Sequence, residues 1–269
     1  PPAVSLQSFI EGYLILGYDH AIWTSILNSL VLAFFQTASA ALAAYTFARL
    51  KFKGSNILFG LVVFTIIVPA QSIMLAQYTS FRHFDIFGLF KLIRGEDLNL
   101  IGSSWAAYLL AATGMGVKGG LYIYILRQSY RQLPVSIEEA AYVDGAGFLK
   151  TFVHIVLPGV SATLLTVSVL SFVWNYADTY YLSLLMGSKA GTSQLAIRLV
   201  NVQNNMRWAI MDIEKYVPSK YVVNFESPLI QKGVACACAI LVIAPLIILY
   251  FFIQKRFVQG VERSGLGGD

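Results

Sequence analysis

Long apolar runs alternate with short polar ones along this 269-residue chain. A helix that crosses about 30 Å of hydrocarbon needs about 20 mostly apolar residues. Five segments meet that requirement, and we expect a membrane span in each: residues 23–48, 56–78, 104–126, 155–185 and 229–253. Lipid offers no partners to backbone N–H and C=O groups, so spans of this length must be helical. The pattern predicts an all-α membrane protein.

Composition supports the membrane assignment. Charged residues make up 12% of the chain and hydrophobic residues 57%, and the mean hydropathy is +0.66. Soluble domains carry about 25% charged residues. The net charge of +5 raises the question of nucleic-acid binding, but no basic stripe interleaves with aromatic residues on a polar segment. We interpret the basic residues as flanks of membrane spans and expect no nucleic-acid partner.

Short loops carry the signal for orientation in a membrane. The turn after the first apolar segment holds Arg49, Lys51 and Lys53 and no acidic residue, so we place it in the cytoplasm. Alternation then assigns the remaining loops: residues 127–154 and the C-terminus inside, residues 79–103 and 186–228 outside. The protein is expected in the cytoplasmic (inner) membrane of a bacterium.

This orientation also suggests how the chain is divided. Residues 1–22 would be an extracytoplasmic segment, and we expect a missing first span to precede Pro1. Residues 23–260 would form the transmembrane domain, followed by a cytoplasmic tail at 261–269.

The loop between the third and fourth apolar segments has a helical pattern of its own. Ser136 followed by Glu139 is a capping box, which predicts a helix that starts at about Ile137. Two strong helix formers with small side chains come next: Ala140 and Ala141. The predicted helix therefore has a smooth surface that a partner can approach closely.

A turn and a second helix are expected after the first. Gly145 permits a sharp reversal with positive φ, and Asp144 can cap the second helix. Apolar side chains then recur at near-helical spacing: Phe148, Phe152 and Ile155. Leu157-Pro158 marks the break into the fourth span. Such a helix–turn–helix suits docking into a groove on a partner protein.

Residues 134–158 resemble the EAA loop of binding-protein-dependent ABC importers of the type I fold. The family pattern is Glu-Ala-Ala, three residues, Gly, nine residues, Ile, one residue and Leu-Pro. The matching positions here are Glu139, Ala140, Ala141, Gly145, Ile155, Leu157 and Pro158. In that family the loop contains a coupling helix that inserts into a cleft of the ATPase subunit. The resemblance implies this role for residues 136–152, and it implies the type I transmembrane bundle.

Two residues of this loop have more than one interpretation. Glu139 either completes the capping box or pairs with a basic residue of the ATPase, and both can hold together. Asp144 either caps the second helix or contacts the partner. Gly145 is needed for the turn under either interpretation.

Other segments resemble the smaller, maltose-type carbohydrate permeases. They are residues 44–54, 126–128, 172–175 and 254–260. The chain departs from that subfamily at Lys53, where proline is frequent, and loop 186–228 does not match it residue by residue. The resemblance implies a permease for a sugar or oligosaccharide. Alternatives are an ABC permease for another solute and a secondary transporter driven by an ion gradient, which would be expected to carry intramembrane acids or interrupted helices in paired halves.

The resemblance also implies partners. They are two ABC ATPase subunits, a second related permease that differs from this chain, an extracytoplasmic solute-binding protein that loop 186–228 would touch, and the lipid bilayer. The sequence has no Gly-x-x-x-x-Gly-Lys-Ser/Thr loop for phosphates, so ATP and magnesium are expected on the separate ATPase. No catalytic constellation or metal-spaced cluster is visible either. We therefore expect a transport subunit that is no enzyme and has no cofactor or metal of its own.

Polar residues inside spans are costly and often functional. Trp174, Asn175 and Asp178 are candidates to contact a polar sugar, because aromatic rings suit sugar faces and amide or carboxylate groups suit hydroxyls. The alternative for them is helix–helix packing. Lys118 is a further candidate for the solute pathway or for contact with another subunit. Its alternative is an ammonium that snorkels or pairs within the bundle.

Overall fold

A computed structural model describes residues 6–86, 88–191, 194–202 and 228–263 of the chain. Within these ranges the regular elements are helices, and an isolated bridge pairs Phe84 with Leu98. The prediction of an all-α fold is confirmed.

The chain divides into two compact units. The first comprises Pro1–Asn28, Ile101–Ser104 and Tyr176–Phe251, and the second comprises Ser29–Leu100, Trp105–Asn175 and Phe252–Asp269. The candidate functional residues named above lie in the second unit, apart from Asp178 and the loop that begins at residue 186.

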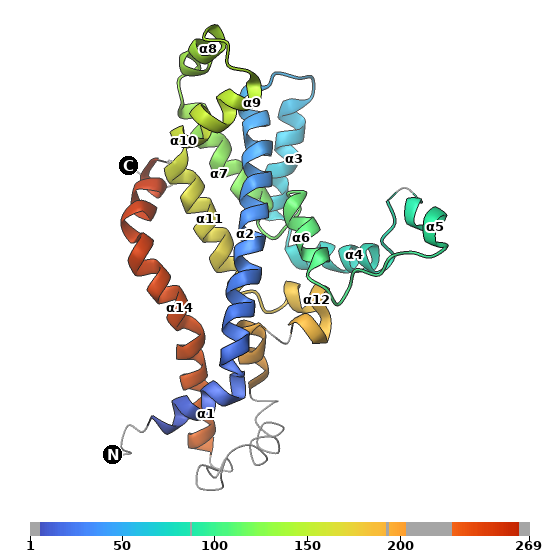
Figure 1. Ribbon diagram of the computed structural model, residues 1–269, viewed down its shortest axis with the longest axis vertical. Helices are drawn as coiled ribbons and strands as arrows, with labels where there is room; N and C mark the ends of the chain where they lie inside the picture. The colour runs from blue at the N-terminus through green and yellow to red at the C-terminus, as the bar shows by residue number, and fades with distance from the viewer. Residues whose placement is uncertain (1–5, 87, 192–193, 203–227, 264–269) are drawn as a thin grey trace. The chain divides into compact units, whose positions relative to one another are not determined.

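Two helices are long and apolar enough to cross a membrane by themselves. They are α2 (Tyr18–Arg49), of 32 residues, and the Leu229–Gln254 part of α14 (Pro228–Arg263), of 26 residues. They correspond to the predicted spans 23–48 and 229–253. Figure 1 shows both as long ribbons, α2 in blue and α14 in red.

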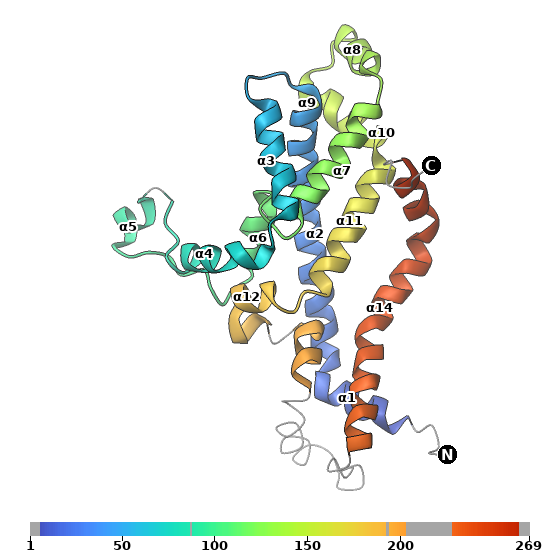
Figure 2. The same cartoon turned by 180° about the vertical axis from the view of Figure 1, so that it is seen from behind.

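The predicted span 56–78 is broken. It consists of α3 (Ser55–Ile67) and α4 (Ala70–Arg82), whose axes differ by 104°. Pro69 lies at the break, and Val68 before it is extended, with φ −67° and ψ 123°. Proline offers no N–H and disfavours the helical conformation of the residue before it, which ends α3 here. The right-angled turn is visible in Figure 2.

The predicted span 104–126 is interrupted as well. Its parts are α6 (Trp105–Ala112) and α7 (Gly119–Gln132), so the glycine-containing run before Lys118 lies in a break between helices. Close packing occurs at the start of α7. A Cβ at Gly120 would come within 2.8 Å of the Val62 carbonyl oxygen of α3. Glycine thus lets α3 and α7 run side by side (Figure 2).

The segment 155–185 also bends. The helical stretch Phe148–Gly159 meets α11 (Ser161–Tyr176) at 80°. That stretch contains α9 (Phe148–Thr151), the π-helical turn η1 (Phe152–Val156) and α10 (Leu157–Gly159). Counting each bent pair as one span gives up to four spans among the described residues.

The first unit contains α1 (Gln7–Leu16), α12 (Tyr181–Gly191) and most of α14. The backbone N–H of Leu195 donates to Ser25 Oγ at 2.8 Å, and the Tyr176 hydroxyl donates to the Val242 carbonyl at 3.0 Å. The predicted outward loop 186–228 begins as helix, because α12 continues to residue 191 and residues 194–202 are mostly helical. Its part at 203–227 lies outside the described residues.

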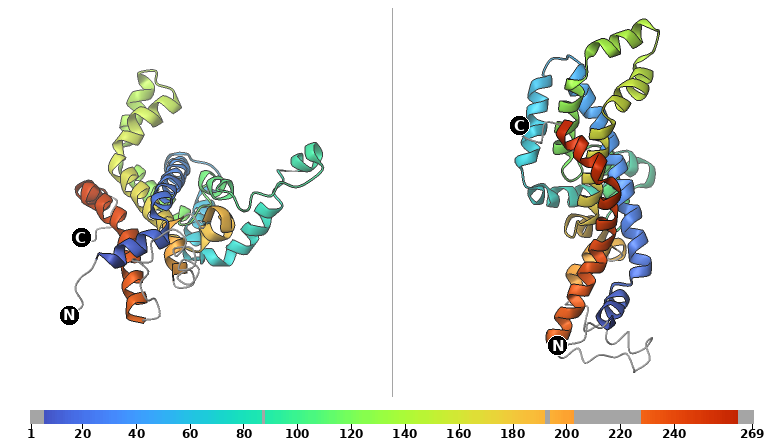
Figure 3. Two further views of the ribbon diagram at one scale, coloured as in Figure 1. Left: turned by 60° about the horizontal axis from the view of Figure 1, so that its bottom comes forward. Right: turned by 90° about the vertical axis from the view of Figure 1, so that its left-hand side faces the viewer.

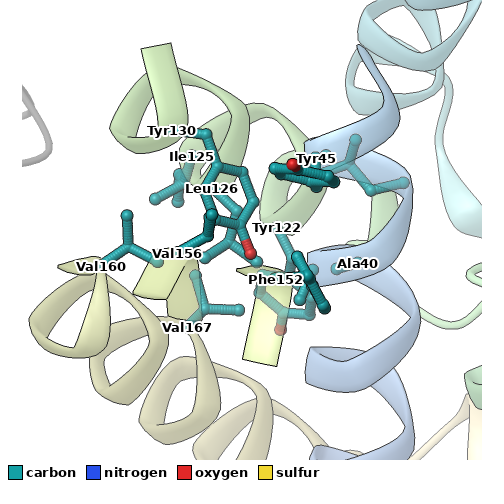
Figure 4. Packing of buried hydrophobic residues seen from close by; sticks show 13 residues of the cluster. Ala40, Tyr45, Tyr122, Ile125, Leu126, Tyr130, Phe152, Val156, Val160 and Val167 are labelled. Atoms are coloured by element: carbon teal, nitrogen blue, oxygen red, sulfur yellow. The ribbon is translucent and has the colours of Figure 1, made fainter. Parts of the chain in front are cut away.

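The core of the second unit joins the base of the 134–158 loop to the bundle. Helices α2, α7 and α11 and the turn η1 contribute buried side chains to it: Ala40, Tyr45, Tyr122, Leu126, Tyr130, Phe152, Val156 and Val167. Figure 4 shows these groups facing one another. Burial of this apolar surface holds the bent segment against α2 and α7.

Candidate functional site

The first helix of the 134–158 loop is α8 (Val135–Val143). It begins two residues before the predicted Ile137, and no side chain caps it, so the predicted capping box of Ser136 and Glu139 is wrong. The physical reason is Pro134 at the N-cap, with φ −60° and ψ 131°. Its fixed φ suits the entry to a helix, which places Ser136 inside the first turn.

The reversal after α8 is confirmed. Gly145 has φ 79°. Its N–H donates to the Tyr142 carbonyl at 3.0 Å, and the N–H of Ala146 donates to the Ala141 carbonyl at 2.9 Å. This pair of bonds is the Schellman arrangement, which a residue with positive φ makes favourable. Figure 3 shows α8 and α9 as the two arms of the resulting hairpin.

Asp144 does not cap the second helix. It is the C-cap of α8, whereas α9 has Gly147 at its N-cap and no side-chain cap. The cap interpretation of Asp144 is therefore wrong, because the turn through Gly145 places two further residues before α9 begins.

The outer face of α8 is open. Glu139, Ala140 and Asp144 are exposed, as is Val143, at 88%. The interpretation of Glu139 as half of a capping box has failed, and its side chain lies on this open face. The face therefore combines a carboxylate, a small residue and an apolar residue, all of them open to contact with another protein.

The inner face of α8 carries a residue that the sequence analysis missed. Glu138 is buried, as is Ala141 one turn later. Its Oε1 accepts from Arg49 Nε of α2 at 2.6 Å, and its Oε2 accepts from the Tyr45 hydroxyl at 2.7 Å. Arg49 Nη2 also donates to the Leu133 carbonyl at 2.8 Å. We call Glu138, Arg49 and Tyr45 the Glu138 anchor.

Aromatic packing surrounds this anchor. The Tyr45 ring lies 4.8 Å from the Phe152 ring and 5.6 Å from those of Phe148 and Tyr130, measured between centroids. Phe148 is also 51% exposed, so it contributes to both the outer surface and the anchor. The sequence offers no signal for the burial of Glu138 beyond its place three residues before Ala141, on the same helix face, because acidic residues are mostly exposed.

The remaining motif residues lie after α9. Ile155 is half-buried in η1, and Leu157 packs against the core. Pro158 is exposed and occupies the first turn of α10, where proline is tolerated. The bend into α11 comes at Val160, with φ −111°, two residues later than Leu157-Pro158 predicted.

A second group of polar residues lies within the helices of the same unit. Gln36 Oε1 of α2 accepts from Asn175 Nδ2 at 3.0 Å and from the Ser171 hydroxyl. Gln36 Nε2 donates to the Val117 carbonyl at 3.5 Å. We call Gln36, Ser171, Asn175 and the Val117 carbonyl the polar cluster. Asn175 is 5% exposed, and its amide links α11 to Gln36 of α2.

Lys118 and Trp174 lie beside this cluster and contact each other. Lys118 Nζ is 4.9 Å from the centroid of the Trp174 ring, a cation–π distance. Lys118 is exposed, and Trp174 is 48% exposed. Three of the four predicted pathway residues are thus brought together: Lys118, Trp174 and Asn175.

Asp178 belongs to the first unit. Its Oδ1 accepts from the Leu182 backbone N–H at 2.7 Å, so the carboxylate caps the start of α12. Across the described part of the chain, no three His, Cys, Asp or Glu side chains are grouped to hold a metal.

Comparison with known proteins gives the family. Residues 36–263 match the family described as binding-protein-dependent transport system inner membrane component. The alpha-glucoside transport system permease protein AglG of Rhizobium meliloti is 28% identical over 277 residues, covering 100% of this chain and 62% of that protein. The maltodextrin transport system permease protein MdxG of Bacillus subtilis is 27% identical over 249 residues, covering 90% and 74%.

A solved structure has a similar fold. It is the crystal structure of a bacterial ABC transporter involved in the import of the acidic polysaccharide alginate, with a TM-score of 0.58 and 19% identity, covering 92% of this chain and 79% of that one. The family match includes the 134–158 loop and the polar cluster and extends over most of the sequence. The chain therefore belongs to the family of binding-protein-dependent transport system inner membrane components.

Proposed function

We propose that this chain forms half of the translocation pathway of an ATP-driven ABC importer for a sugar or oligosaccharide. The observation that carries the proposal is the family match over residues 36–263. The open face of α8 lies inside the matched segment. The sugar is supported by the alpha-glucoside and maltodextrin systems to which similar proteins belong.

The proposal includes partners. Two ATPase subunits bind ATP and magnesium, a second related permease completes the pathway, and an extracytoplasmic binding protein delivers the solute. The 134–158 loop and the C-terminus face the cytoplasm in this arrangement, as the basic turn at Arg49, Lys51 and Lys53 indicates.

The outer face of α8 is the surface we assign to the ATPase. It presents Glu139 for a basic partner, Ala140 for close approach and Val143 for apolar contact, all exposed. The Schellman turn at Gly145 fixes the direction in which the chain returns to the bundle. Movement of the ATPase subunits would displace this hairpin and switch the access of the bundle between faces of the membrane.

Lys118 and Trp174 are the residues we assign to the solute pathway. An exposed indole offers a flat face for a sugar ring, and the ammonium above it can donate to hydroxyl oxygens. Asn175 supports Trp174 from the neighbouring position through its bonds to Gln36. Asp178 supports the start of α12.

ATP hydrolysis by the whole complex in lipid tests the proposal. It is measured with and without the binding protein loaded with maltotriose or trehalose, and uptake of the same radiolabelled sugars is followed. Gly145→Val should abolish the stimulation of ATP hydrolysis by the loaded binding protein, because a β-branched residue is strained at φ 79°. Gly147→Val is the matched control, since Gly147 has φ −72° and no atom within 4 Å of an added Cβ.

The outcomes separate the alternatives. The proposal predicts that loaded binding protein stimulates ATP hydrolysis in wild type and in Gly147→Val but not in an assembled Gly145→Val complex. That result supports an importer permease that is coupled through α8. If no ATPase copurifies, or hydrolysis ignores the binding protein, the proposal is wrong and a gradient-driven transporter replaces it. Stimulation without uptake of either sugar would reject only these two sugars as solutes.

A further inference from the structure

We propose that Glu138 is a positioning residue that fastens the α8 hairpin to α2, so that displacement of the hairpin moves α2 and, through Gln36, the residues around Lys118 and Trp174. The inference rests on the proposed function, because it names the path by which ATPase movement reaches the solute pathway within this chain. Each step of the path lies in the second compact unit.

The attachment at the loop end is strong and specific. Arg49 and Glu138 side chains are 12% and 7% exposed, and their ion pair is 2.6 Å long. Charge-assisted bonds of this kind are shorter and stronger than neutral ones. The Tyr45 hydroxyl occupies the second carboxylate oxygen. Removing one partner leaves a buried charge uncompensated, so α8 and the end of α2 are expected to move together.

The covalent connection from the hairpin to α11 is built differently. It passes through the π-helical turn η1 and then bends by 80° at Val160. A π-turn and a sharp bend depart from the geometry of a straight helix, and Phe152 of this connection packs against Tyr45 of α2. Displacement of α8 therefore reaches α11 around a bend, whereas it reaches α2 through the direct ion pair and through this packing.

Helix α2 then carries the displacement to the polar cluster. It is one helix from Tyr18 to Arg49. Gln36 lies nine residues before Tyr45, about 14 Å along the axis at the rise of a helix. Its side chain bonds Asn175 and the Val117 carbonyl, which are the sequence neighbours of Trp174 and Lys118. A shift of α2 thus acts on both pathway residues.

The test uses the whole reconstituted complex with its ATPase, second permease and binding protein. Glu138→Gln should leave the ATPase bound and basal hydrolysis intact but lower the stimulation by loaded binding protein roughly tenfold, in the range of ordinary coupling free energies. Arg49→Glu places two carboxylates against each other and should lower the stimulation at least as much. The double variant Glu138→Arg with Arg49→Glu should recover most of the stimulation. Lys53→Gln, an exposed basic residue in the same turn, is the control and should match wild type.

Failure of this inference is distinguishable from failure of the proposed function. If the binding protein stimulates ATP hydrolysis in Glu138→Gln and Arg49→Glu as much as in wild type, the proposed role of the Glu138 anchor is wrong and the proposed function stands. Wild-type hydrolysis that ignores the binding protein overturns the proposed function. Absence of rescue in the charge-swapped double variant also counts against the anchor, because exchanging the charges restores an ion pair between α8 and α2.

A distance measurement covers the case in which the Glu138 variants do not assemble. Spin labels are placed on Ser136 of α8 and Leu42 of α2, and in a second sample on Ser136 and Ser168 of α11. On addition of a non-hydrolysable ATP analogue, the Ser136–Leu42 distance should stay constant and the Ser136–Ser168 distance should change. A Ser136–Leu42 change as large as the other overturns the inference.

Discussion

Two regions of the molecule contain a residue with positive φ. Gly145, in the turn of the α8 hairpin, has φ 79°, and Lys118, in the break before α7, has φ 63°. Glycine has no Cβ and adopts this conformation freely, whereas a lysine there costs about 1 kcal/mol or more. Among the described residues, Lys118 is the non-glycine residue with positive φ.

The surroundings of the two residues differ as well. No atom lies within 4 Å of a Cβ added at Gly145, and its turn is held by backbone hydrogen bonds between near neighbours in sequence. The break at Lys118 also has local bonds, such as the one from the Gly119 N–H to the Gly116 carbonyl at 3.0 Å, but Gln36 contacts it from α2, with partners 81 and 139 residues away. The hairpin turn is thus a local structure, whereas the break combines local bonds with tertiary contacts. Backbone strain maintained by such contacts is typical of functional sites.

The largest effect is expected from Gln36→Leu. The change removes the acceptor of Asn175 and Ser171 and leaves buried donors unpaired, so it should lower the stability of the complex by about 2–4 kcal/mol. Thermal unfolding of the purified complex measures it. Gln71→Leu is a comparison on α4, where the side chain is exposed, and it should cost less. Equal losses in the two variants would show that the break does not depend on Gln36.

The next effect is a difference between two variants, Lys118→Gly and Lys118→Ala. Both lose the contact of the ammonium with Trp174, and only glycine relieves the strained φ. The glycine variant should therefore unfold at a higher temperature than the alanine variant, equivalent to about 1 kcal/mol. If the assignment of Lys118 to the solute pathway is right, both variants should reduce sugar uptake in spite of that difference in stability. Normal uptake in both would remove Lys118 from the pathway.

The smallest effect on stability is expected from Trp174→Leu. The loss of the contact with the Lys118 ammonium costs about 0.5–1 kcal/mol at an exposed site. Trp174→Phe keeps an aromatic face and should retain more uptake than leucine does. Uptake assays on the two variants at several sugar concentrations separate an effect on apparent affinity from one on rate. Identical uptake in both would favour simple packing for this residue.

Prediction from sequence succeeded where a signal is local. The spans at 23–48 and 229–253 follow from apolar length, and the reversal at Gly145 follows from glycine between two helical patterns. The capping box failed because Pro134 starts α8 earlier. The straight span over 56–78 failed because Pro69 ends α3, although proline is visible in the sequence. Apolar content alone does not distinguish a straight span from a bent one.

The amino-acid sequence by itself determined the all-α membrane class, the exposed hairpin at 134–158 and the family resemblance that this hairpin carries, because each depends on spacing within a short segment. The tertiary structure alone decided which residues join distant parts of the chain. Glu138 meets Arg49 across 89 positions and Asn175 meets Gln36 across 139. Such pairs leave no periodic signal, since a buried polar group requires a partner but nothing near it in the sequence specifies which one.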